Sequence, residues 1–121
     1  MNIYESAEDY LEAILMIKEK KGIVRSIDVA EELGYSKASV SIAMKKLREN
    51  GYISMGKEGG IILLQPGEEI AQRIYERHRV LTAIFEHLGV KHETAVKDAC
   101  KVEHDLSPET FAALKQFANT I

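Results

Sequence analysis

The sequence predicts a mainly α-helical protein in which a winged helix-turn-helix is followed by a helical domain. Three observations predict this fold class. Apolar residues recur at helical spacing along most of the 121 residues. In the first half, two helical patterns are separated by a tight turn that contains Gly34, which is the order of a helix-turn-helix. Two β-prone runs then flank a glycine-rich segment, which is typical of a hairpin.

Capping residues and apolar periodicity define the first three helices. The first is expected over residues 6–20. Ser26 is a suitable N-cap for a short second helix, which Gly34 ends. Ser36 caps the third helix, which ends at Asn50. The residues expected to face the core are Ala7, Tyr10, Leu11, Ile14, Leu15, Ile17, Ile27, Val29, Ala30, Leu33, Val40, Ala43, Met44 and Leu47.

A β-hairpin is expected after the third helix. The runs Tyr52–Met55 and Ile61–Leu64 are β-prone, and the segment Gly56–Gly60 between them is rich in glycine. An isolated hairpin is only marginally stable, so this one needs the helices for support. Three helices and a hairpin, or wing, make a winged helix-turn-helix domain, which we place at residues 1–65.

Three further helices are predicted in a second domain, residues 66–121. Pro66-Gly67 interrupts the chain, and a helix of more than about twenty residues is expected from Glu68. A fifth helix follows over residues 93–105. Ser107-Pro108 opens a sixth, with a capping serine and a proline at the first helical position. These helices carry more apolar surface than a small winged domain covers, which predicts a homodimer through them; packing within a monomer is the alternative.

Composition narrows the class of protein further. The chain is 45% hydrophobic and 29% charged, as in ordinary soluble proteins. Its apolar runs are far shorter than the roughly 20 residues that span a bilayer, and its start lacks the basic-then-apolar order of a signal peptide. We therefore expect a cytoplasmic protein without membrane contact, in which the single cysteine remains a thiol.

Positive charge is concentrated around the third predicted helix, although the net charge of the chain is −3. Short side chains near the start of that helix permit close approach to base edges, and the cations behind them suit phosphates. A solvated helix face is the alternative interpretation. We expect a dimer that reads double-stranded palindromic DNA, with recognition helices about 34 Å apart. The expected DNA contacts are Arg25, Ser36, Lys37, Ala38, Ser39, Ser41, Lys45, Arg48 and Lys57.

A possible metal site lies in the fifth predicted helix. Cys100, Glu103 and His104 are spaced i, i+3 and i+4, which places their side chains on one helix face. A thiol, a carboxylate and an imidazole are suitable donors for a borderline transition metal. Taken singly, each residue has a structural explanation, such as a small core residue for Cys100.

Several segments resemble the diphtheria toxin repressor family of metal-dependent repressors, which includes the shorter manganese transport regulators. The resemblance covers nearly the whole chain. It implies a winged helix-turn-helix DNA-binding domain and a helical metal-binding and dimerisation domain. The segments are Ser6-Ala7-Glu8-Asp9-Tyr10-Leu11-Glu12, Val29-Ala30-Glu31-Glu32-Leu33, Ser39-Val40-Ser41, Arg77-His78-Arg79 and Asp98-Ala99-Cys100-Lys101-Val102-Glu103-His104.

The resemblance also implies a ligand set, with two departures. Iron-type members carry a methionine where Asp9 stands, and manganese-type members carry a carboxylate where Cys100 stands. The ancillary site of the family uses an imidazole and a carboxylate where this chain has Val96 and Thr82, so one main metal position per subunit is expected. The implied ligands are Asp9, Glu12, His78, Cys100, Glu103 and His104. His87 and His92 match no ligand position and are expected on the surface.

The function implied is that of a metal-dependent transcriptional repressor, which controls metal uptake genes. A bound cation would join the first DNA-binding helix to the dimerisation helices and so fix the direction of each recognition helix. A thiolate beside an imidazole favours Fe(II), with Mn(II) next because of the carboxylates, and Co(II) or Zn(II) would bind in vitro. Since the ligands must be deprotonated, metal binding should weaken as pH falls.

Two other classes of function compete with this one. A metal-independent winged-helix regulator would use the cysteine and histidines only structurally. A metallohydrolase is disfavoured, because six protein donors fill an octahedral ion and leave no position for an activated water. The sequence therefore predicts a protein that is not an enzyme.

Overall fold

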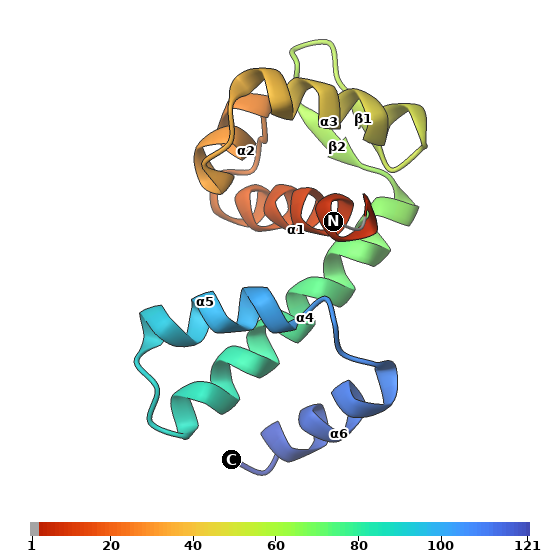
Figure 1. The fold of residues 1–121 in the computed structure, drawn as a ribbon. Helices are drawn as coiled ribbons and strands as arrows, with labels where there is room; N and C mark the ends of the chain where they lie inside the picture. Colours follow the sequence, from red (N-terminus) through yellow and green to blue (C-terminus); the bar gives the residue numbers. More distant parts are fainter. Residues whose placement is uncertain (1–2) are drawn as a thin grey trace. The chain divides into compact units, whose positions relative to one another are not determined.

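The computed structural model describes the backbone of residues 3–121 and the side chains of residues 6–121. This range holds six helices and one two-stranded sheet (Figure 1). Within the described residues, every helix is too short or too polar to cross a membrane. The helices are α1 (Ile3–Lys21), α2 (Ser26–Leu33), α3 (Lys37–Glu49), α4 (Gln65–His87), α5 (His92–Val102) and α6 (Pro108–Ala118), and the strands are β1 (Ile53–Met55) and β2 (Ile61–Leu63).

The chain divides into two compact units, which we call unit 1 (Met1–Gln72) and unit 2 (Arg73–Ile121). The division falls inside α4, so the first two turns of this helix belong to unit 1. Unit 1 contains α1, α2, α3 and the hairpin, and unit 2 contains most of α4 with α5 and α6. The order of elements confirms the predicted fold class.

The core of unit 1 is formed by apolar side chains from all three helices. Leu11 and Ile14 of α1, Val29 of α2 and Val40 of α3 are fully buried. Their spacing is the helical spacing that the sequence predicted for the inward face. The prediction is wrong for Ile27, which is 44% exposed. Four other residues predicted to face the core are only half-buried: Ala7, Tyr10, Leu33 and Ala43.

The start of α2 differs from the prediction. Ser26 is the first helical residue and not the cap, which is Arg25. The carboxylate of Asp28 takes over the capping role, since it accepts the backbone N–H of Arg25 at 2.9 Å and the ammonium of Lys21 at 3.1 Å. The Arg25 amide first, and then Lys21, lower the pKa of Asp28. The predicted end of the helix is confirmed, because Gly34 adopts a left-handed φ of 72°.

The wing is a short antiparallel hairpin. Ile53 pairs with Leu63, Ser54 with Ile62, and Met55 with Ile61. The backbone N–H of Ile61 also donates to the carbonyl of Val24 at 2.7 Å, which fastens the hairpin to the loop between α1 and α2. The predicted strands are correct in place, although each is one residue shorter than expected.

Pro66 and Gly67 lie inside the first turn of α4, so the prediction that they interrupt the chain before Glu68 is wrong. A proline is compatible with a first turn, where backbone N–H groups have no partner within the helix. Gly67 is buried, and a Cβ at this position would clash with the carbonyl oxygen of Tyr52. Glycine is therefore required there by close packing rather than by a break in the helix.

In unit 2, the sixth helix lies where the sequence predicted it, and the fifth is shorter than predicted. The hydroxyl of Ser107 accepts the N–H of Thr110 at 3.1 Å, and Pro108 opens α6 as predicted. Helix α5 ends at Val102, three residues before the predicted end, and Glu103 is its C-cap. None of the residues of α6 is buried, and Phe117 is 46% exposed. The apolar stripe of α6, formed by Phe111, Leu114, Phe117 and Ala118, is therefore only partly covered in the single chain.

Candidate metal centre and DNA-binding surface

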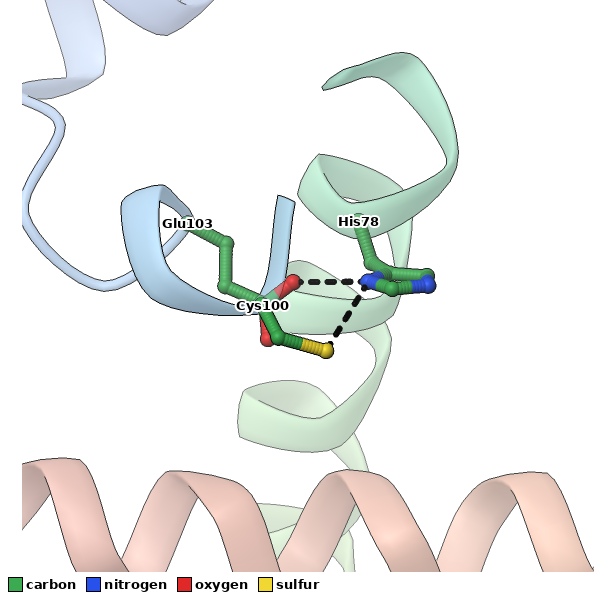
Figure 2. A group of neighbouring side chains, drawn as sticks. All are labelled: His78, Cys100 and Glu103. Atoms are coloured by element: carbon green, nitrogen blue, oxygen red, sulfur yellow. Dashed lines mark hydrogen bonds and ion pairs between the residues drawn. The ribbon is translucent and has the colours of Figure 1, made fainter. Parts of the chain in front are cut away.

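Three of the predicted ligands gather in unit 2 (Figure 2). His78 lies on α4, Cys100 on the last turn of α5, and Glu103 at the C-cap of α5. The Nδ1 atom of His78 is 3.0 Å from Oε2 of Glu103 and 3.7 Å from Sγ of Cys100. One donor atom from each residue lies within 4.8 Å of the other two. We call these residues the His-Cys-Glu cluster.

Two residues of the cluster are buried and the third is exposed. Glu103 has no exposed surface and His78 is 8% exposed, whereas Cys100 is exposed. A carboxylate removed from water is costly unless hydrogen bonds or positive charge compensate it. An imidazole nitrogen, a thiol sulfur and such a carboxylate form a donor set suited to a borderline transition metal, and the exposed thiol provides an entry path. The residues present therefore fit a divalent metal ion.

His104 belongs to the same region of unit 2. Its Nε2 atom is 3.5 Å from Oε1 of Glu103, and its side chain is 3% exposed. Glu103 thus has one imidazole near each carboxylate oxygen, that of His78 near Oε2 and that of His104 near Oε1. The sequence predicted Cys100, Glu103 and His104 on one face of a helix. Because α5 ends at Val102, only Cys100 lies within the helix, and the other two follow its end. The C-cap retains helical backbone angles, with φ −57° and ψ −28°.

Sequence reasoning missed Arg77, a buried side chain that holds this turn. Its Nη1 atom donates to the carbonyl of Glu103 at 3.1 Å and to the carbonyl of Leu106 at 2.8 Å. Its guanidinium carbon lies 5.3 Å from the centre of the Phe111 ring of α6. One arginine therefore joins α4 to the end of α5 and to α6. The only signal in the sequence was its position next to His78.

Asp9 and Glu12 lie one turn apart on α1, in unit 1. Asp9 is half-buried and Glu12 is 6% exposed. Tyr10, between them, meets the ring of Tyr35 edge to face with centroids 5.9 Å apart. Burial raises the pKa of the Tyr10 hydroxyl, and Tyr35 and Asp9 raise it further. The assignment of both carboxylates as metal ligands stays a prediction.

The two histidines outside the ligand set are exposed, whereas the two positions matched to the ancillary site are at least half-buried; the absence of that second site stays a prediction. His87 and His92 are exposed, as expected. The ring of His92 lies 3.1 Å from the carboxylate of Glu86. Thr82 is buried on α4 and Val96 is half-buried on α5.

All nine residues predicted to contact DNA are exposed. They are Arg25, Ser36, Lys37, Ala38, Ser39, Ser41, Lys45, Arg48 and Lys57. The predicted cap of α3 is confirmed, because Ser36 Oγ accepts the N–H of Ser39 at 3.1 Å. Their role in DNA binding stays a prediction.

Sequence reasoning also passed over Ile42 in the middle of α3, which is 59% exposed. Neither positive charge nor a short side chain, the two features that suggested DNA contacts on this helix, marks an isoleucine in the sequence.

Known proteins resemble the chain along nearly its whole length. The iron dependent repressor N-terminal DNA binding domain matches residues 2–61, and the iron dependent repressor metal binding and dimerisation domain matches residues 65–121. An HTH-type transcriptional regulator of Methanocaldococcus jannaschii is 37% identical over 115 residues, which cover 93% of this chain and 92% of that protein. The transcriptional regulator MntR of Bacillus subtilis is 36% identical over 102 residues, covering 84% and 72%.

Solved structures show the same fold. A manganese-dependent transcriptional repressor in complex with manganese superposes with a TM-score of 0.85 at 27% identity, over 93% of this chain and 52% of that one. The metal-dependent transcriptional regulator MtsR gives a TM-score of 0.84 at 28% identity, over 93% and 53%. This chain therefore spans about half the length of these solved proteins. The two matched domains together with these relatives show that the chain belongs to the iron dependent repressor family, a family of transcriptional regulators that are not enzymes.

Proposed function

We propose that this protein is a metal-dependent transcriptional repressor activated by Fe(II) in preference to Mn(II), and that it controls metal uptake genes from the cytoplasm. The His-Cys-Glu cluster is the observation that carries the proposal, because it brings nitrogen, sulfur and oxygen donors of unit 2 within 4.8 Å of one another. The family supports the DNA-binding half of the proposal. Residues 1–65 would form the DNA-binding domain and residues 66–121 the metal-binding and dimerisation domain.

Six side chains would hold the ion. His78, Cys100 and Glu103 would supply the donors that already lie together, and His104 the second imidazole beside Glu103. Asp9 and Glu12 would complete the set, supported by their i, i+3 spacing on α1 and by their match to the family's first helix. When bound, the ion supplies positive charge that draws these carboxylates and the thiolate together. Arg77 keeps Glu103 and the turn after α5 in place.

The preference for Fe(II) over Mn(II) is argued from the softness of the donors. A cysteine sulfur favours Fe(II), Co(II) or Zn(II) over Mn(II), whereas carboxylates accept Mn(II). The cluster contains one thiol, one imidazole and one carboxylate, so it should bind the softer ions more tightly. Zn(II) and Co(II) would also bind in vitro, since affinity follows the Irving–Williams order.

The protein is further proposed to act as a homodimer on a palindromic operator. No residue of α6 is buried, and its apolar stripe suits a self-complementary interface between two copies. Such a dimer would present two copies of α3 to successive major grooves, about 34 Å apart.

Fluorescence anisotropy with a DNA duplex tests the metal switch. The wild-type protein would first select a duplex from randomised DNA in anaerobic Fe(II) buffer, and its affinity would then be measured with Fe(II), with Mn(II) and with a chelator. We expect either metal to tighten binding about 5- to 150-fold, the range of typical allosteric coupling. Equal affinities in the three buffers would contradict the switch and favour a metal-independent winged-helix regulator.

Two matched variants test whether the metal response depends on the cluster. His78→Ala should lose the metal response and keep the weaker binding that the chelated protein shows. His87→Ala, a histidine on the exposed end of the same helix, should respond to metal as the wild type does. A full metal response in the His78→Ala variant would remove His78 from the proposed ligand set.

A further inference from the structure

The exposed side chain of Ile42 lies on the outer face of α3, the helix that the proposed function places in the major groove. Val40 and Met44, two residues to either side, are 0% and 2% exposed. Two residues correspond to about 200° of rotation around an α-helix. Ile42 therefore points away from the core of unit 1, and 59% of its surface is exposed.

The neighbours of Ile42 on this face differ from it in chemistry. Ala38 and Ser39 precede it by one turn, and Lys45 and Lys46 follow it by one turn; all four are exposed. The lysines suit phosphate oxygens, and the small residues allow the helix to approach the bases closely. Among these five exposed positions of α3, Ile42 is thus the long apolar side chain, and the other four are small or cationic.

We propose that Ile42 reads a thymine in each half of the operator through van der Waals contact with the C5-methyl group. This inference rests on the proposed function and adds one base that the protein would recognise. Each base presents hydrogen-bonding groups at its major-groove edge, and thymine alone adds an apolar methyl group there. An isoleucine has no donor or acceptor, so it gains from the methyl group and would leave the polar edges of other bases without partners.

Replacement of thymine by uracil tests the contact, because it removes only the methyl group and keeps the base pair. The wild-type protein would select a duplex from randomised DNA, and each thymine of that duplex would then be replaced singly by deoxyuridine. We expect one position in each half-site at which the substitution weakens binding about fourfold, and about fifteenfold when both are replaced, as expected for one buried methyl group each.

Two variants assign the effect to Ile42. Ile42→Ala should bind the thymine and uracil duplexes equally at those positions, while Ile42→Val should keep part of the discrimination. The control is Ile62→Ala, which shortens another exposed isoleucine, on β2 of the wing. It should keep the full discrimination at the same positions.

The possible outcomes are distinct. Binding that is insensitive to uracil at every position would overturn the inference, as would discrimination that survives unchanged in Ile42→Ala. The assay is run with saturating Mn(II) and with a chelator at higher protein concentration. Loss of the metal response with intact thymine discrimination would contradict the proposed switch and leave the role of Ile42 standing.

Discussion

Cys100 distinguishes this cluster from one built only of oxygen and nitrogen donors. Its sulfur lies 3.7 Å from Nδ1 of His78, and the residue is exposed to solvent. Because the thiolate is the softest donor present, it should contribute most to the binding of the softer ions.

Cobalt(II) reports on this sulfur directly. We predict that the wild-type protein with Co(II) shows the near-ultraviolet charge-transfer absorption of a thiolate–cobalt bond, and that Cys100→Ser loses it. The variant should also bind Co(II) at least about tenfold more weakly. Lys101→Ala, at the next exposed position, is the control and should retain both properties. An unchanged spectrum in Cys100→Ser would remove the thiol from the ligand set.

Arg77 is predicted to stabilise unit 2 even without metal. It is 7% exposed and donates to two backbone carbonyls, so its loss would remove one buried and one partly buried hydrogen bond. We expect Arg77→Ala to lower the free energy of unfolding by about 3 kcal/mol in urea titrations of the metal-free protein. Arg79→Ala is the control, because Arg79 is exposed and stacks on Tyr75 at 4.7 Å; its cost should stay below about 1 kcal/mol. Equal costs would show that the two carbonyl bonds of Arg77 add no stability.

The stability of helix α2 depends on one ionised carboxylate at its start, that of Asp28. The pKa of Asp28 is lowered in the folded protein, so its stabilising effect is complete above the ordinary pKa of about 4 and is lost as pH falls through the lower folded-state value. We predict that Asp28→Asn costs about 1 kcal/mol at pH 7. The difference from the wild type should shrink below about pH 4, as followed by urea unfolding.

The control for this pH dependence lies on the same helix. Glu31 is exposed on α2, and Glu31→Gln should follow the pH profile of the wild type. A cost of Asp28→Asn that stays constant down to pH 2 would contradict the proposed capping role of the carboxylate.

The elements were predictable where the signal is local. Ser36 and Ser107 cap the helices that follow them, as the sequence indicated, because capping depends on a few neighbouring residues. The prediction failed at Pro66-Gly67, where contact with the distant Tyr52 decides that glycine is needed. It failed again at Arg77, whose partners lie 26 and 29 residues further along the chain. The sequence therefore shows the donors of the cluster, and the structure adds the side chain that holds them.

The partly covered apolar stripe of α6 predicts that the molecule self-associates. Phe117 is 46% exposed, and a second copy would bury it. We predict that Phe117→Asp raises the dimer dissociation constant at least about tenfold in sedimentation equilibrium, because a charge would have to be desolvated in the interface. Gln116→Glu, which also adds a negative charge at an exposed position of α6, should leave the dimer largely intact. A wild-type protein that is monomeric at micromolar concentration would contradict the interface.

Thermodynamic linkage provides the most direct test of the metal switch. If metal tightens DNA binding by a given factor, DNA must tighten metal binding by the same factor. The decisive measurement is the dissociation constant of Mn(II), followed anaerobically by isothermal titration with and without saturating selected duplex. We predict an affinity gain with DNA of about 5- to 150-fold, equal to the gain found for DNA with metal. An unchanged Mn(II) affinity would show that the metal site and the DNA-binding surface are independent.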